Sequence, residues 1–134
     1  ALAPQAAQKR ISIVSEGALT LWAVEKDLWE ILHNLMGNAI RYGRRGGHVK
    51  ILLRQRCIIV EDDGIGIEKK HLPYLFEQFY RVDQSRDPEV RGTGLGLSIV
   101  RTLAERNGAT VGVESCPGRG SRFTVCFEQK QDGD

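Results

Sequence analysis

The sequence predicts an α+β fold, a two-layer α/β sandwich in which a mixed sheet of about five strands carries three helices on one face. Two segments, residues 27–42 and 93–107, repeat apolar side chains at helical spacing. Several shorter segments alternate apolar and polar side chains as strands do. The length of 134 residues fits a single domain.

The composition narrows the class of protein. Hydrophobic residues make up 41% of the chain, and 19 basic residues face 17 acidic ones, for a net charge of +2. This mixture is that of an ordinary globular domain, and the balanced charge argues against a nucleic-acid partner. No apolar run approaches the roughly 20 residues that span a bilayer, so we expect no membrane contact by this fragment.

The first residues of the chain and its cysteines lead to two further expectations. The chain begins without methionine or a signal-peptide layout, so we expect an excised piece of a longer protein. Its three cysteines, Cys57, Cys116 and Cys126, are an odd number without C-x-x-C spacing. This pattern argues against zinc and against a disulfide framework, and it favours a reducing cytosol.

The first half of the chain predicts a lead-in, two strands and a helix. The first dozen residues are rich in alanine and glutamine and are expected to be mobile, and residues 11–14 and 19–23 alternate as strands. Asp27 and Glu30 have the spacing of a capping box at the start of the helix over 27–42. The core-facing stripe of this helix comprises Leu28, Ile31, Leu32, Leu35 and Ala39, and the glycines that end it are Gly43, Gly46 and Gly47.

The second half predicts four strands, a second helix and a long charged loop. Residues 49–54 and 57–62 are expected to form two strands joined at a turn. Residues 69–81 contain one or two helical turns, with Pro73 at the first position of the second. The loop over 82–91, the helix over 93–107 and the strands over 110–115 and 121–128 complete the chain.

Asn34, Asn38 and Arg41 lie on the polar side of the first helix, opposite its apolar stripe. Amide oxygens are hard, neutral ligands suited to magnesium, and an arginine beside them would meet phosphate oxygens. Asparagine and arginine are also common on solvated helix faces, so this pattern alone leaves both interpretations open.

An apolar strand delivers Asp62 to the sequence Asp62-Asp63-Gly64-Ile65-Gly66. The two glycines allow a tight turn and a close approach to a ligand. A buried aspartate that accepts a hydrogen bond from an exocyclic amine would select adenine, because guanine presents a carbonyl oxygen there. The alternative is a plain Asp-Gly turn, whereas a calcium loop is excluded because its downstream oxygen ligands are missing.

A third motif lies at the start of the second helix. Gly92, Gly94 and Gly96 alternate into the helix, where bare N–H groups and the positive end of the helix dipole can hold phosphate. The alternative is a flexible hinge. Within residues 75–81, we expect Phe76 and Phe79 to fill the core and Arg81 to reach a phosphate.

Together and in this order, these motifs resemble the catalytic, ATP-binding domain of sensor histidine kinases, in the superfamily with the Bergerat fold that DNA gyrase, the heat-shock chaperone and mismatch-repair ATPases share. The likeness covers about residues 11–128. The matching segments are the N box at 33–42, the first glycine box at 61–67, the F box at 75–81, the second glycine box at 91–100 and the closing hairpin at 117–127.

The resemblance implies a role for each matching residue. Asn38 would hold magnesium, with Asn34 as its neighbour or a second ligand. Arg41 and Arg81 would contact phosphates, and these four residues form the expected catalytic set. The remaining ATP contacts would be Tyr42 near the adenine, Asp62 on its amino group, Gly64, Gly66 and Ile67 around the pocket floor, and Gly92, Thr93, Gly94, Leu95, Gly96 and Leu97 around the phosphates.

The resemblance also implies a domain organisation, and the sequence departs from the family pattern at a few positions. Residues 1–10 would lead in from an upstream dimerisation region, the catalytic domain would span 11–128 with an ATP lid at about 82–92, and 129–134 would be a polar tail. Arg41 stands where the family usually has lysine, and Arg91 where many members have glycine. A phosphoacceptor segment is absent, and the surroundings of His33, His48 and His71 do not resemble one.

The implied function is to bind Mg-ATP and donate its γ-phosphate to a histidine on a separate dimerisation domain, for onward signalling to the receiver domain of a response regulator. The full protein would be a bacterial sensor anchored in the inner membrane, with this domain in the cytoplasm. The alternatives are a degenerate nucleotide-sensing or interaction module and an ATP-hydrolysing clamp. A clamp would need a glutamate where this chain has Asn34, and Glu30 is a poor substitute.

Overall fold

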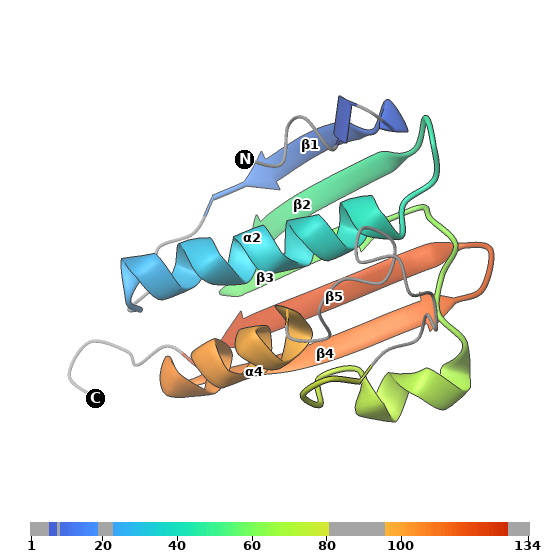
Figure 1. The fold of residues 1–134 in the computed structure, drawn as a ribbon. Coiled ribbons are helices and arrows are strands. Elements are labelled where there is room, and N and C mark those ends of the chain that lie inside the picture. The colour runs from blue at the N-terminus through green and yellow to red at the C-terminus, as the bar shows by residue number, and fades with distance from the viewer. Residues whose placement is uncertain (1–5, 8, 19–22, 81–95, 129–134) are drawn as a thin grey trace.

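The computed structural model describes residues 6–7, 9–18, 23–80 and 96–128 and shows a mixed sheet in front of which the helices lie (Figure 1). The strand order is β1-β2-β3-β5-β4. The edge strand β1 pairs in parallel with β2, and all other neighbours are antiparallel. The strands are β1 (Ser12–Gly17), β2 (His48–Arg54), β3 (Cys57–Asp62), β4 (Ala109–Cys116) and β5 (Gly120–Phe127).

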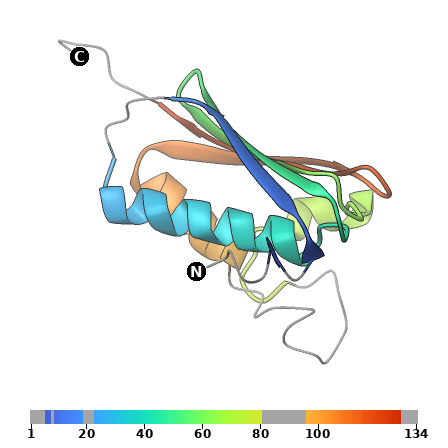
Figure 2. The ribbon, with the colours of Figure 1, turned by 90° about the horizontal axis from the view of Figure 1, so that it is seen from above.

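Within the described residues after 10, two α-helices and one 3-10 helix cover a single face of this sheet, as the view from above shows (Figure 2). They are α2 (Glu25–Arg41), α4 (Gly96–Arg106) and the 3-10 helix η1 (Lys69–Tyr74). The predicted α+β sandwich with a mixed five-stranded sheet is therefore confirmed. Pro73, expected to begin a second helix, lies inside η1 instead.

The core lies between the helices and the sheet. On α2, Ile31, Leu35 and Ala39 are each at most 1% exposed, as the predicted stripe requires, while Leu28 and Leu32 are half-buried at its margin. Burial of this apolar stripe is the main stabilisation of the helix. The stripe joins a cluster that includes Val49, Val60, Val100, Leu103, Ala104, Phe123, Val125 and Phe127.

The start of α2 differs from the prediction. The helix begins at Glu25 with Val24 as its N-cap, and no side chain caps it. The Asp27 carboxylate instead accepts hydrogen bonds from Arg106 Nε (3.1 Å) and Asn107 Nδ2 (2.8 Å) at the end of α4. The expected capping box is therefore wrong, because a tertiary ion pair takes the carboxylate. Of the expected strand over 19–23, residues 19–22 lie outside the described ranges, and Ala23 forms a bend.

The N-terminal residues that the structure describes pack on the domain. Residues 6, 7 and 9 are helical, and Ala6 and Ile11 belong to the core. The Ile11 N–H donates to the Ala6 carbonyl at 2.9 Å, and the Ser12 N–H to the Gly47 carbonyl at 3.0 Å. The described residues of this segment therefore pack against the core, where a solvent-exposed lead-in was expected.

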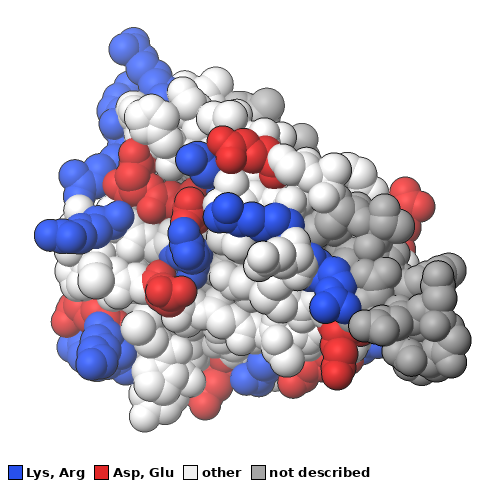
Figure 3. Space-filling model, turned by 180° about the vertical axis from the view of Figure 1, so that it is seen from behind, with Lys and Arg blue, Asp and Glu red and all other residues white. Residues whose placement is uncertain are grey.

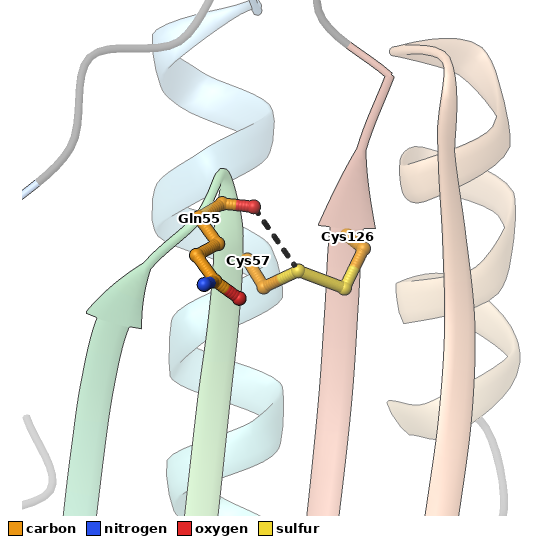
Figure 4. Close-up of a disulfide and its surroundings, with 3 residues drawn as sticks. All are labelled: Gln55, Cys57 and Cys126. Atoms are coloured by element: carbon orange, nitrogen blue, oxygen red, sulfur yellow. Dashed lines mark hydrogen bonds between the residues drawn. A yellow bond between two sulfur atoms is a disulfide. The ribbon is translucent and has the colours of Figure 1, made fainter.

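Cys57 and Cys126 form a disulfide between β3 and β5 (Figure 4). The expectation that no disulfide forms is wrong for this pair, while Cys116 is a free, exposed thiol. The two cysteines stand directly opposite each other in the β3–β5 register, although 69 residues separate them. A spacing rule that looks for local cysteine pairs cannot detect a pairing that strand register creates.

Candidate functional site

Asp62 is the last residue of β3 and lies on the helix side of the sheet, in phase with the buried Ile58 and Val60. Its Oδ1 accepts the Gly64 N–H at 2.9 Å, which closes the turn after the strand. Burial raises the pKa of this carboxyl, while hydrogen bonds from the N–H groups of Gly64 and Ser121 partly oppose the rise. The carboxylate is therefore half-buried, and no described residue pairs with it as a cation.

Gly64 and Gly66 are required by close backbone contacts. A Cβ at Gly64 would lie 2.1 Å from the Tyr42 carbonyl oxygen, and one at Gly66 would lie 2.0 Å from the Cys116 carbonyl oxygen. Gly66 also has a φ of +74°. The turn after Asp62 is thus pressed against the end of α2 on one side and the end of β4 on the other.

Tyr42 joins the first helix to this turn. It follows the last residue of α2, and its carbonyl accepts the Ile65 N–H at 3.1 Å. Asp62, Gly64 and Tyr42 are therefore brought together, as the predicted adenine pocket requires. Ile67 belongs to the hydrophobic core at 6% exposure, and its N–H donates to Ser115 Oγ at 2.8 Å.

The polar side of α2 presents two asparagines. Asn34 Nδ2 donates to the Glu30 carbonyl at 2.8 Å, which leaves its Oδ1 directed toward the start of α4, where a Cβ at Gly96 would lie 3.3 Å away. No hydrogen bond joins the half-buried Asn38 side chain to another residue in the described ranges. Arg41 is exposed at the end of the same helix.

The structure places part of the predicted phosphate segment. Gly96 and Leu97 form the first turn of α4, so this helix end faces Asn34. The dipole of a helix favours an anion at its N-terminus. The other predicted residues of this segment lie outside the described residues: Arg81, Gly92, Thr93, Gly94 and Leu95, together with the lid expected at about 82–92.

A shallow hollow of about 420 Å³ reaches onto the outer face of the sheet, which no helix covers. Its rim carries both signs of charge, and Figure 3 shows acidic and basic side chains interspersed over this face. Two pairs of these groups interact: Arg122 Nε with Glu61 Oε2 at 2.5 Å, and His48 Nδ1 with Asp63 Oδ2 at 3.0 Å. Asp62 lies at its edge, but neither Asn34 nor Asn38 lines the hollow, so the hollow is not the nucleotide site.

Sequence reasoning missed the residues that support Asp62 from β5. A Cβ at Gly120, which has a φ of +99°, would lie 2.0 Å from the Asp62 carbonyl oxygen. Ser121 pairs with Asp62 in the sheet and is itself buried. The Pro-Gly-x-Gly turn that precedes Ser121 is a local signal, but its proximity to Asp62 follows only from the β3–β5 register.

The half-buried Asp62, the asparagine-bearing face of α2 and the start of α4 at Gly96 are the site features that the structure describes. The family model described as "Histidine kinase-, DNA gyrase B-, and HSP90-like ATPase" matches residues 23–131. The chain belongs to this family of ATPases.

The relatives are sensor histidine kinases. The chain is 40% identical to the phosphate regulon sensor protein PhoR of Pseudomonas aeruginosa over 126 residues, which cover 91% of the chain and 28% of PhoR. It is 39% identical to the sensor histidine kinase RppB of Synechocystis over 118 residues, covering 85% of the chain and 26% of RppB. Within the family, the chain is the catalytic, ATP-binding domain of a sensor histidine kinase.

Solved structures agree on the fold. The mycobacterial sensor histidine kinase MprB superposes with a TM-score of 0.78 at 23% identity, over 92% of this chain and 88% of that one. Full-length ShkA in complex with AMPPNP superposes with a TM-score of 0.76 at 28% identity, over 96% of this chain and 28% of that one. The chain spans little more than a quarter of the length of PhoR and RppB. Within the ranges that the structure describes, no helix has the length and apolar character needed to cross a membrane.

Proposed function

We propose that the chain binds Mg-ATP against α2, the turn after Asp62 and the start of α4, and presents its γ-phosphate to a histidine on a separate dimerisation domain of the same full-length protein. The observation that carries this proposal is the half-buried Asp62 carboxylate beside the end of α2. Burial of a charged group without a cationic partner costs stability, and such groups concentrate at functional sites.

Adenine selectivity follows from the chemistry of Asp62. Its Oδ1 is already held by the Gly64 N–H, so the carboxylate has a fixed orientation. An ionised carboxylate only accepts hydrogen bonds, and the exocyclic amine of adenine donates one. The carbonyl of guanine would instead place two acceptors opposite each other, so we expect GTP to bind far more weakly.

The residues present fit a magnesium ion. Among the described residues no group of three His, Cys, Asp or Glu side chains could hold a metal, so the protein ligands would be the amide oxygens of Asn38 and Asn34. Asn34 Oδ1 faces the helix start at Gly96, where phosphate oxygens would complete the coordination. Bound there, the ion would neutralise charge on the phosphates.

The chain would supply positioning and charge, and the nucleophile would come from elsewhere. Phosphoryl transfer depends mainly on alignment and charge neutralisation, for which Arg41, Arg81 and the start of α4 are suited. The attacking imidazole would belong to the dimerisation domain, so this chain alone would not phosphorylate itself. The phosphoryl group would then pass to a response regulator. The domain would lie in the cytoplasm as part of a bacterial sensor anchored in the inner membrane. Residues 1–10 would connect it to the upstream dimerisation region.

Calorimetric titration of the chain with ATP, with and without magnesium and with GTP as the control, tests the proposal. We expect adenine-selective binding in the micromolar range, about −8 kcal/mol at 1 μM, that strengthens with magnesium. A folded sample that binds neither nucleotide would contradict the proposal and favour a degenerate interaction module. Equal binding of ATP and GTP would contradict the role of Asp62.

A further inference from the structure

Lys9 lies far from the nucleotide motifs in sequence, yet its ammonium group contacts the end of α2, which carries one of them. Its ammonium donates to three carbonyl oxygens at the end of α2: those of Ile40 (2.9 Å), Arg41 (2.7 Å) and Gly43 (3.4 Å). The carbonyls at a helix C-terminus lack intrahelical partners and carry the negative end of the helix dipole, which a cation stabilises.

The carbonyl of Tyr42, which lies between those of Arg41 and Gly43, binds the turn that follows Asp62. Tyr42 O accepts the N–H of Ile65, at 3.1 Å. Four consecutive carbonyls, those of residues 40–43, are therefore bound from two sides, by Lys9 and by the turn that follows Asp62. The end of α2 is the junction at which the segment before β1 meets the adenine pocket.

The backbone around Lys9 is fixed to the same junction. The Lys9 carbonyl accepts the Gly46 N–H at 2.7 Å, and the neighbouring Ala6 and Ile11 are buried in the core. A Cβ at Gly43 would lie 2.9 Å from Ile11 Cδ1, so the segment and the helix end are in close contact. Burial, followed by the charge of Arg41, lowers the pKa of Lys9.

We propose that Lys9 is a positioning residue of the nucleotide site: its ammonium fixes the end of α2, so that Asn38 and Tyr42 keep their place relative to the Asp62 turn. This inference rests on the proposed ATP binding. Lys9 touches neither nucleotide nor metal in this account, and it acts only through the helix end. The segment that precedes β1 thereby becomes part of the nucleotide site.

The test compares Lys9→Met with Lys9→Arg and with Lys26→Met in the whole 134-residue chain. Methionine keeps the length of the side chain and removes the donor, whereas arginine can still donate to the same carbonyls. Lys26 carries the same charge in an exposed position at the opposite end of α2. Calorimetry with Mg-ATP, at a temperature at which thermal unfolding shows every variant to be folded, gives the affinity.

We expect Lys9→Met to raise the Kd for Mg-ATP about ten-fold, by analogy with other residues that orient a binding group. Lys9→Arg should stay within about two-fold of the wild type, and so should Lys26→Met. A folded Lys9→Met variant that lowers the unfolding temperature and leaves the Kd unchanged would overturn the inference, because Lys9 would then be merely structural.

Two further measurements keep the test decisive. If Lys9→Met does not fold, Lys9→Gln, which keeps an uncharged donor on a shorter side chain, takes its place; we expect a smaller loss of affinity than ten-fold, and an unchanged Kd would overturn the inference. In the nucleotide-free protein, we also expect the amide NMR resonances of Tyr42 and Ile65 to shift in Lys9→Met and not in Lys26→Met. A wild-type chain that binds no ATP would defeat the proposed function, whereas wild-type binding with an unchanged variant Kd defeats only the role of Lys9.

Discussion

An aspartate lies at each end of α2, and the two differ in their partners and in the direction of their pKa shifts. Near the start of the helix, Asp27 is 2% exposed and is bound by Arg106 and Asn107, whose hydrogen bonds lower its pKa. Beside the end of the helix, Asp62 is half-buried with no cationic partner in the described part of the chain, and burial raises its pKa. The same side chain is thus favoured in its ionised form at one end of the domain and disfavoured at the other.

The difference separates a structural end from a functional end. Asn107 also accepts the Val24 N–H at 2.8 Å, so residues at the end of α4 bind both Asp27 and the residue that precedes α2. The Cys57–Cys126 disulfide belongs to this same end, because Phe127 next to it pairs with Ala109, two residues beyond Asn107. At the other end, Asn38 and Asp62 keep hydrogen-bonding capacity that a ligand can use. Natural proteins tolerate such local costs where function requires them.

The largest effect on stability should come from the disulfide, at the structural end. In the chain-entropy model, closing a loop with a sequence separation of 69 stabilises the fold by up to about 4 kcal/mol. We expect a Cys57→Ser/Cys126→Ser variant to lose stability of this order in denaturant unfolding without a change in ATP affinity. Cys116→Ser, which removes the free exposed thiol, is the matched control and should be neutral. Weaker ATP binding in the folded double variant would contradict the claim that the structural end does not affect the nucleotide site.

Gly64→Ala should damage both stability and binding, because the added Cβ would lie 2.1 Å from a backbone oxygen at the functional end. Backbone cannot move aside as a flexible side chain can, so we expect a loss of about 3 kcal/mol in the free energy of unfolding. The control is Gly112→Ala, where no atom lies within 4 Å of the added carbon. A Gly64→Ala variant as stable as that control would show that the turn is not pressed against Tyr42.

Asp62→Asn should abolish adenine recognition and spare the fold. The amide removes the acceptor charge, so we expect at least about a 100-fold loss of ATP affinity by calorimetry, equivalent to about 2.7 kcal/mol. Because burial raises the pKa of Asp62, its ionised form weakens the folded state at neutral pH. The unfolding temperature should therefore stay the same or rise. An unchanged affinity would remove Asp62 from the site.

Asp27→Asn should have the smallest effect, on stability alone. Loss of the ionised partner of Arg106 is expected to lower the unfolding temperature by about 5 °C, with ATP affinity within two-fold of the wild type.

The pH dependence of stability provides a second test of the role of Asp27. The folded-state pKa of Asp27 lies below its ordinary value of 3.8, so its stabilisation is complete above that pH and is lost as the pH falls through the folded-state value. Thermal unfolding between pH 2 and 7 should show the wild type and Asp27→Asn converging toward the acid end. Parallel curves over this range would contradict the assigned ion pair.

Local patterns in the sequence predicted much of the fold. Periodicity located both helices, and the alternation around Ile58 and Val60 gave β3 with its observed bounds. The motif after this strand correctly placed Asp62 at its end and Gly64 in the turn. These features depend on neighbours a few residues apart, which periodicity and turn chemistry report directly.

Most features that the sequence did not reveal depend on contacts between distant segments; a local exception is Phe79, which was expected in the core and is 62% exposed. Asp27 has the spacing of a capping box, but its partner Arg106 lies 79 residues away. Cys57 meets Cys126 only through the strand register, and Lys9 meets the end of α2 across 31 or more residues. Each of these contacts follows from the tertiary fold and leaves no local signature.

The most direct test of the two-ended account is thermal unfolding of Asp27→Asn and Asp62→Asn, side by side, with and without saturating Mg-ATP. A ligand that binds only the folded state stabilises it by about 2.7 kcal/mol at 100 times its Kd. We predict that Asp27→Asn unfolds at a lower temperature than the wild type and keeps the full ATP-induced rise, while Asp62→Asn unfolds no lower than the wild type and loses that rise. If Asp62→Asn keeps the rise, or if Asp27→Asn loses it while folded, the division into a structural and a functional end is wrong.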